Sequence, residues 1–85
     1  MDEKTSLFDV NIIKKKLVAS TIHEVFEALK ERGYNPINQL VGYLISGDPG
    51  YISSYKDSRS KIQEYDRAEI MAIILEDYLK KLWDV

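Results

Sequence analysis

The chain has 85 residues, no cysteine, one histidine and a formal net charge of −2 at pH 7. This length predicts one domain. Without cysteine there can be no disulfide or thiolate metal site, and one histidine cannot form a histidine-rich site, so we expect neither metal nor cofactor. The small negative charge gives no general attraction to nucleic acid or anionic lipid. No apolar run approaches the ~20 residues of a membrane span, and no signal peptide is recognisable, so we expect a cytoplasmic protein.

The first ten residues mix charged, hydroxyl and apolar side chains without a period, which predicts a mobile N-terminal tail over residues 1–10. Thr5 and Ser6 are hydroxyl residues that a kinase could reach there, although simple solvation explains them from the residues alone. Residues 11–85 are expected to form a single helical domain.

A first helix is predicted over residues 11–32. Its apolar residues recur at helical spacing and predict one stripe facing a core; they are Val18, Ile22, Val25, Phe26 and Leu29. The basic triplet at residues 14–16 is interpreted as a solvated face rather than a phosphate grip, since glutamates on the same helix offset it. His23 has only Glu27 at a helical ligand spacing, so we assign it no metal role.

Residues 33–54 hold all four glycines and both prolines. Gly33 can end a helix in the left-handed conformation, and Asn35 followed by Pro36 can cap and restart one. Gly47 would end this second helix, predicted over residues 36–46, and Asp48 opens a tight Asp-Pro-Gly turn in which Gly50 could take a positive φ.

The second helix has two contrasting faces in projection. One apolar stripe consists of Ile37, Leu40, Val41 and Leu44. The opposite face carries Asn38, Gln39, Gly42 and Tyr43. Because glycine inside a helix costs up to ~1 kcal/mol relative to alanine, Gly42 predicts close approach of another backbone, with a bound ligand as the less favoured interpretation.

Ser54 and Asp57 fit a capping box, which predicts a third helix over residues 56–64 with Arg59 and Lys61 outward and Ile62 inward. Asp66 with Glu69 predicts a further cap, which would start a last helix over residues 67–83.

The last helix has an apolar arc that covers about half of its circumference. The arc comprises Ile70, Met71, Ile73, Ile74, Leu75, Tyr78, Leu79 and Leu82. One small core cannot cover so wide a surface, so the sequence predicts an all-α bundle of four to five short helices that packs internally and also pairs with a second copy as a two-fold homodimer.

No sequence pattern for catalysis is recognisable: there is no HExxH, no supported nucleophile–histidine set and no lysine after the Gly47–Gly50 turn to make a phosphate loop. We therefore expect a non-enzyme. The alternative is a helix-turn-helix-like DNA-binding protein, in which Arg59 and Lys61 would enter the major groove. The long connection over residues 47–56 and the nearby acidic residues argue against it.

The run GYNPINQLVGYLISGDPGYI, followed by KDSR and YDRAEI, resembles the IreB/ReoM family of small bacterial regulators over more than half of the chain. The motif residues are Gly33, Tyr34, Asn35, Pro36, Asn38, Gln39, Gly42, Tyr43, Gly47, Asp48, Pro49 and Tyr51.

The resemblance implies an all-helical homodimer that is phosphorylated on a tail threonine, here Thr5, by a membrane-bound PASTA-domain serine/threonine kinase. In the family, the unphosphorylated protein promotes ClpC–ClpP degradation of MurA, which starts peptidoglycan precursor synthesis, and the family is tied to cephalosporin resistance. The resemblance also implies partner binding by arginines, here Arg59 and Arg67, while Ser54 and Gln63 stand where the family has two others.

Overall fold

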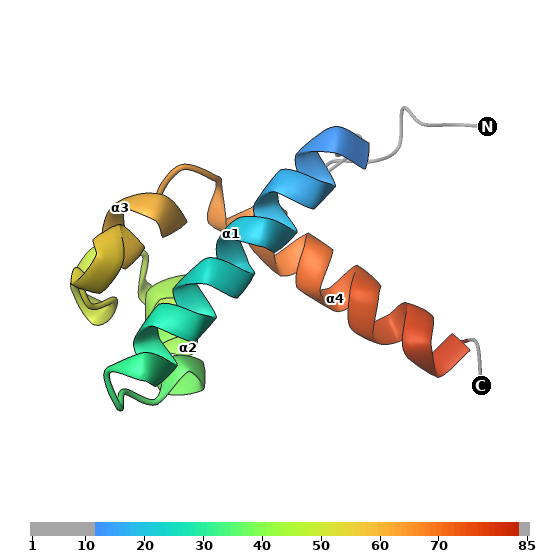
Figure 1. Ribbon diagram of the computed structural model, residues 1–85. Coiled ribbons are helices and arrows are strands. Elements are labelled where there is room, and N and C mark those ends of the chain that lie inside the picture. The colour runs from blue at the N-terminus through green and yellow to red at the C-terminus, as the bar shows by residue number, and fades with distance from the viewer. Residues whose placement is uncertain (1–11, 84–85) are drawn as a thin grey trace.

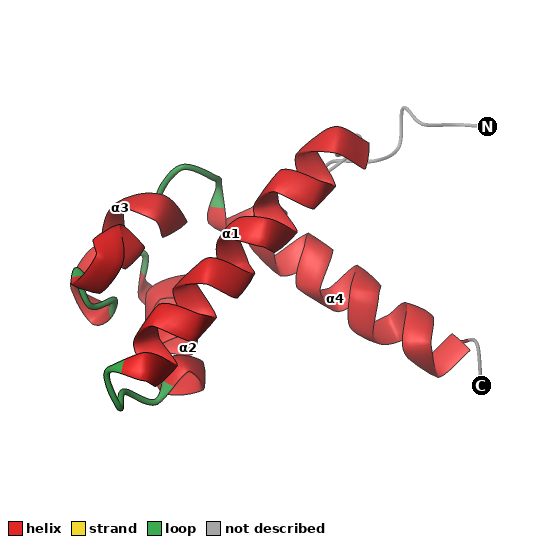
Figure 2. Ribbon diagram, in the orientation of Figure 1, coloured by secondary structure: helices red, strands yellow, loops and turns green. Residues whose placement is uncertain are grey.

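The computed structural model describes residues 12–83 (Figure 1). Within this range the chain forms four α-helices, and no residue lies in a strand (Figure 2). They are α1 (Ile12–Glu31), α2 (Pro36–Ser46), α3 (Ser58–Ile62) and α4 (Arg67–Trp83), with the short 3₁₀ turns η2 (Pro49–Tyr51) and η3 (Tyr55–Asp57) between α2 and α3. The predicted all-α class is confirmed. The predicted tail over residues 1–10 lies outside the described residues.

Helix α1 is the central element of the fold. The short helices α2 and α3 pack along its C-terminal part, and α4 crosses it nearer its N-terminus (Figure 1). The C-terminal part of α4 extends away from α2 and α3. One end of the molecule is therefore a small bundle, and the other is an open crossing of two long helices.

The core lies where α1 meets the shorter elements. It comprises Val18, Val25, Leu29, Tyr43, Ile52, Ile62 and Ile70. Four of the five residues in the predicted stripe of α1 are confirmed, since three are fully buried and Ile22 packs against the cluster; Phe26 is half-buried outside it. Helix α4 supplies only Ile70 to the buried set, although half-buried Ile73 also packs there.

The ends of α2 are fixed by the local signals that the sequence predicts. Gly33 and Gly47 have φ of 81° and 78°, the left-handed conformation that ends each preceding helix. The Asn35 side chain accepts a hydrogen bond from the backbone N–H of Asn38 at 3.1 Å, which caps the start of α2. Helix α2 begins at Pro36 and ends at Ser46, as expected.

The apolar stripe of α2 coincides only in part with the face that the helix buries. Ile37 and Val41 do not face the core: their side chains are 62% and 46% exposed. Tyr43, assigned to the opposite face, is instead a core residue with 5% exposure. The helix is rotated so that the Tyr43 side, with partly buried Leu40 and Leu44, meets α1.

The predictions for residues 48–58 also need correction. The Asp48 side chain accepts from the Gly50 N–H at 2.8 Å and caps η2, whereas Gly50 does not take a positive φ. The Ser54 side chain makes no capping hydrogen bond. The predicted capping box is therefore wrong, and α3 begins only at Ser58. Lys56 and Asp57 take positive φ instead of entering the helix.

Candidate interaction surface

Helix α4 presents a long apolar surface that the described chain leaves uncovered. Seven large hydrophobic side chains on it are between 39% and 84% exposed. They are Met71, Ile74, Leu75, Tyr78, Leu79, Leu82 and Trp83. A contiguous apolar surface of this kind on a folded domain is a candidate site of interaction with another molecule.

The spacing of these residues is that of a helix-packing seam. Ala68, Met71, Leu75, Tyr78 and Leu82 alternate three and four residues apart, the a and d pattern of a coiled coil. An apolar hollow of about 280 Å³ lies among Ala68, Met71, Ala72 and Leu75, the i, i+3, i+4 and i+7 positions that form the hole for an incoming knob. We call the five alternating residues the α4 seam.

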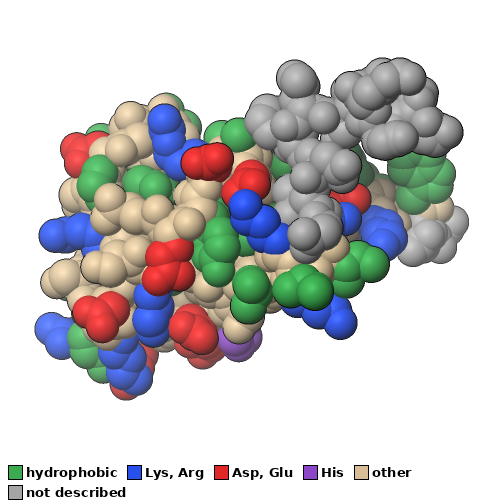
Figure 3. Space-filling view, turned by 90° about the horizontal axis from the view of Figure 1, so that it is seen from above, with side chains coloured by type: hydrophobic (Ala, Val, Ile, Leu, Met, Phe, Trp, Pro, Cys, Tyr) green, Lys and Arg blue, Asp and Glu red, His purple; other side chains and the backbone are tan. Residues whose placement is uncertain are grey.

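The N-terminal part of α1 adds apolar residues at the same end of the molecule. Ile12, Ile13 and Leu17 are 70%, 73% and 53% exposed. Figure 3 shows hydrophobic side chains reaching the surface on the half of the molecule formed by this part of α1 and by α4. The apolar surface therefore extends beyond a single helix.

Two ion pairs join α1 and α4. Lys14 Nζ lies 2.9 Å from a Glu69 carboxylate oxygen, and Lys15 Nζ lies 2.7 Å from one of Glu76. The hydrogen bond to Glu69, reinforced by its charge, raises the pKa of Lys14. The basic triplet is thus not simply solvated, since two of its members bind α4. Sequence reasoning missed these pairs because the partners are more than fifty residues apart.

Both arginines that the resemblance singles out donate hydrogen bonds to backbone carbonyls. Arg59 Nε lies 2.8 Å from the Ile52 oxygen, and Arg67 Nη1 lies 3.0 Å from the Leu44 oxygen. Both side chains are nevertheless exposed. The two residues therefore join elements of the fold and also present charge to solvent.

Motif residues of α2 contact the segment that contains η2. The Tyr51 ring lies over Gly42, where an added Cβ would come within 2.5 Å of Tyr51 Cδ1. The Gln39 side chain accepts from the Ser53 N–H at 3.0 Å. Gly42 thus permits close approach, as predicted, but of an aromatic side chain rather than a backbone.

The described residues support neither DNA binding by α3 nor the binding of a metal ion. Helix α3 has five residues, which is short for a helix that must read a major groove. Over residues 12–83, no group of histidine and carboxylate side chains is arranged to hold a metal ion, and no helix there could cross a membrane. His23 is exposed on α1. Thr5, the predicted phosphorylation site, lies outside the described residues.

Comparison with known protein families gives a match over nearly the whole chain. The model of the IreB regulatory phosphoprotein family matches residues 3–80. The match covers all four helices as far as the last turn of α4, and it includes the N-terminal segment that carries Thr5.

Proposed function

Because the chain belongs to the IreB regulatory phosphoprotein family, we propose that it is a non-catalytic cytoplasmic regulator that acts through protein–protein contacts. The observation that carries the proposal is the uncovered apolar surface of α4, whose side chains are up to 84% exposed. A domain of this size is marginal alone, and a second subunit is one of the usual remedies.

The first partner is a second copy of the chain, packed on the α4 seam. Ile74 and Leu79 flank the seam and widen its apolar face, so α4 has room for more than one neighbouring helix. Isologous pairing, in which each copy offers the same surface, is the default symmetry for such a contact. The exposed apolar residues of α1 would extend the same interface.

The regulatory signal is phosphorylation of Thr5 by a PASTA-domain serine/threonine kinase. By its resemblance to the family, the unphosphorylated protein promotes degradation of MurA by the ClpC–ClpP protease. Loss of MurA then limits peptidoglycan synthesis and affects cephalosporin resistance. A phosphate adds about −1.5 to −2 charges and three strong acceptor oxygens. Arginine is the residue best suited to bind such a group or an acidic partner.

Arg59 and Arg67 are the proposed contact residues. Each uses one guanidinium nitrogen for a backbone carbonyl, and neither forms an ion pair with another described residue. Their remaining donors can bind a partner carboxylate in the unphosphorylated state. Phosphothreonine 5 would then compete for the same donors and weaken that contact.

A pull-down from a host that carries the kinase and protease tests this scheme. Thr5→Ala should retain partners after kinase treatment, and Thr5→Glu should lose them. Arg59→Ala should weaken capture while the chain still folds, as a cooperative thermal transition would verify. Ser6→Ala is the matched control and should behave as wild type. Unchanged capture in all Thr5 and Arg59 variants, or kinase labelling confined to Ser6, would overturn the scheme.

A further inference from the structure

The segment between η2 and α3 holds two consecutive non-glycine residues in a left-handed conformation. Lys56 has φ 52° and ψ 35°, and Asp57 has φ 62° and ψ 23°. L-residues with a Cβ disfavour this region, and side chains other than glycine visit it as single residues rather than in succession. Two adjacent cases therefore need contacts elsewhere to hold them.

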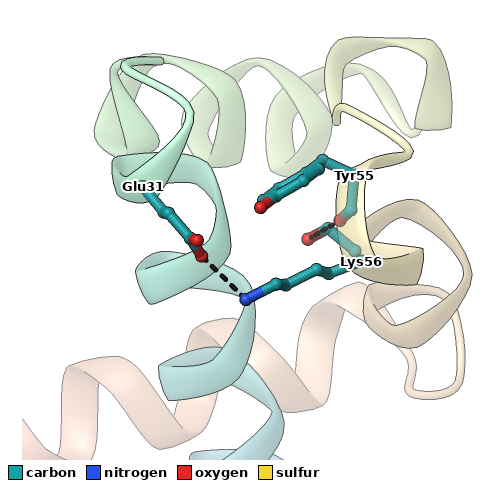
Figure 4. A network of polar contacts seen from close by, with 4 residues as sticks. Glu31, Tyr55 and Lys56 are labelled. Atoms are coloured by element: carbon teal, nitrogen blue, oxygen red, sulfur yellow. Dashed lines mark hydrogen bonds and ion pairs between the residues drawn. The ribbon is translucent and has the colours of Figure 1, made fainter.

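The contacts that hold this segment come from the end of α1. Lys56 Nζ lies 2.8 Å from a Glu31 carboxylate oxygen. Two cations lie near the Tyr55 ring, with Arg32 Cζ 4.8 Å and Lys56 Nζ 5.6 Å from its centroid. Figure 4 shows the Tyr55 hydroxyl and the Lys56 ammonium both directed toward Glu31. One carboxylate on α1 thus binds Lys56, the first of the two residues with positive φ.

The same segment determines how α3 and Arg59 are placed. Ser58 is 1% exposed, and its hydroxyl donates to the Tyr55 carbonyl at 2.8 Å. The Asp57 N–H donates to the Ser54 carbonyl at 3.0 Å. Arg59 follows directly and binds the Ile52 carbonyl. A change in the backbone at residues 56–57 would therefore alter the start of α3.

We infer that residues 53–58 form a two-state latch, in which Glu31 holds the strained Lys56–Asp57 backbone closed and loss of that contact lets the segment open and releases the start of α3. The latch opens without unfolding the core, because Glu31 and Lys56 are exposed and no residue of 53–58 belongs to the core cluster. An acidic partner group that draws Lys56 away from Glu31 would open it. This device belongs to the isolated protein and does not depend on phosphorylation of Thr5.

Hydrogen exchange of the backbone N–H groups tests the latch on the full chain. The Asp57 and Ser58 N–H groups report opening, since both are hydrogen-bonded within the segment. The Gly47 N–H, bonded to the Tyr43 carbonyl at 2.7 Å, reports the end of α2, outside the segment. Glu31→Gln should lower the protection factors of the two reporters by about threefold or more and leave that of Gly47 within twofold.

Two further variants separate strain from charge. Asp57→Gly relieves strain at a residue whose side chain makes no capping hydrogen bond, so it should raise the protection factor of Ser58. Glu24→Gln is the matched control: it removes the 3.1 Å ion pair of Glu24 with Lys61, which joins α1 to α3 without touching residues 56–57. It should leave the reporters unchanged.

The inference is overturned by any of three results. Glu31→Gln could leave the Asp57 and Ser58 protection factors within twofold of wild type. It could instead lower the Gly47 protection factor equally, which would indicate global destabilisation. Lastly, Asp57→Gly could accelerate exchange at Ser58, which would show that the left-handed backbone at this position is not strained.

Discussion

The guanidinium group of Arg67, the first residue of α4, donates a hydrogen bond to the carbonyl oxygen of Leu44 near the end of α2, with 3.0 Å between Nη1 and the oxygen. Helix α2 has no basic residue in its own last turn. A helix C-terminus carries partial negative charge and unpaired carbonyls, so a cation there is favourable. Arg67 supplies that cation from another helix.

Arg67→Ala should therefore lower the free energy of unfolding by about 1 kcal/mol, the usual loss for one hydrogen bond that is partly exposed. Arg67→Lys should recover part of it, since the charge remains but the planar fork is lost. Urea denaturation measures both changes. Lys80→Ala, an exposed cation on the same helix, is the control and should differ from wild type by less than about 0.5 kcal/mol. Equal effects at the two positions would show that Arg67 contributes only its charge.

Gly47 lies directly under the same guanidinium group. A Cβ there would come within 2.8 Å of Arg67 Cζ, and the residue has φ 78°. Gly47→Ala should therefore cost about 1–2 kcal/mol from backbone conformation alone, plus the displacement of Arg67. In the double variant Gly47→Ala/Arg67→Ala, the cost of displacing the Arg67 side chain should disappear. Denaturation of the two single variants and the double variant measures this; strictly additive losses would mean that Arg67 moves aside freely.

Gly42 provides a prediction in which two effects oppose each other. Alanine is favoured over glycine inside a helix by up to ~1 kcal/mol, but its Cβ would meet the Tyr51 ring at 2.5 Å. Since a contact that short forces the ring to move, we expect Gly42→Ala to be destabilising and Gly42→Leu to cost roughly 1–3 kcal/mol. In a Tyr51→Ala background, Gly42→Ala should instead stabilise. A stabilising Gly42→Ala in the wild-type background would refute the close packing.

The features that sequence reasoning predicted are those with a local cause. Gly33, Asn35 and Gly47 act within a few residues of themselves, so the bounds of α2 could be read from the chain. The face that α2 buries could not, because this helix has no charged residue to mark its solvent side. Packing against α1 decided that Tyr43 is buried and Ile37 exposed.

Long-range contacts explain the other differences between the predicted and the observed structure. Ser54 and Asp57 match a helix-capping pattern, yet the pairing of Lys56 with Glu31 across 25 residues accompanies a different backbone. The role of Arg67 as a cap for α2 depends on a carbonyl 23 residues away. The wide apolar arc of α4 could be predicted without knowledge of any long-range contact. The composition and spacing of this helix alone indicated more apolar surface than one small core can cover.

The Glu31–Lys56 pair should make stability depend on pH. The hydrogen bond from Lys56, and next that from Tyr55, lowers the pKa of Glu31. A carboxyl with a lowered pKa in the folded state stabilises the fold above its unfolded pKa, about 4.3, and the contribution is lost as pH falls through the folded pKa. Glu31→Gln should therefore be less stable than wild type at pH 7, and this difference should be smaller at pH 3.

Urea midpoints at the two pH values, each in low and high salt, measure this difference. Both side chains of the pair are about half exposed, so the effect at pH 7 should be small and should decrease in high salt. Glu24→Gln, which removes the ion pair between Glu24 of α1 and Lys61 of α3, provides the comparison. A deficit of Glu31→Gln that persists at pH 3 would mean that the glutamate acts through packing rather than charge.

The final prediction concerns the α4 seam. Leu75 is at its centre and is 56% exposed, so Leu75→Glu should leave the folded chain nearly intact. In a dimer packed on the seam, the same change buries an unpaired carboxylate in an apolar hole, which is costly. We expect the dimer dissociation constant to rise at least about tenfold, or 1.4 kcal/mol. Sedimentation equilibrium at micromolar concentration measures it, with a thermal transition to verify folding.

Lys80→Gln is the control for that experiment, because it changes the net charge by the same amount on the same helix but lies outside the seam. It should dimerise as wild type does. A wild-type chain that is monomeric at these concentrations would reject self-association. A dimer that survives Leu75→Glu would show that pairing uses a different face, and the exposed Ile37 and Ile45 of α2 would then be the residues to change.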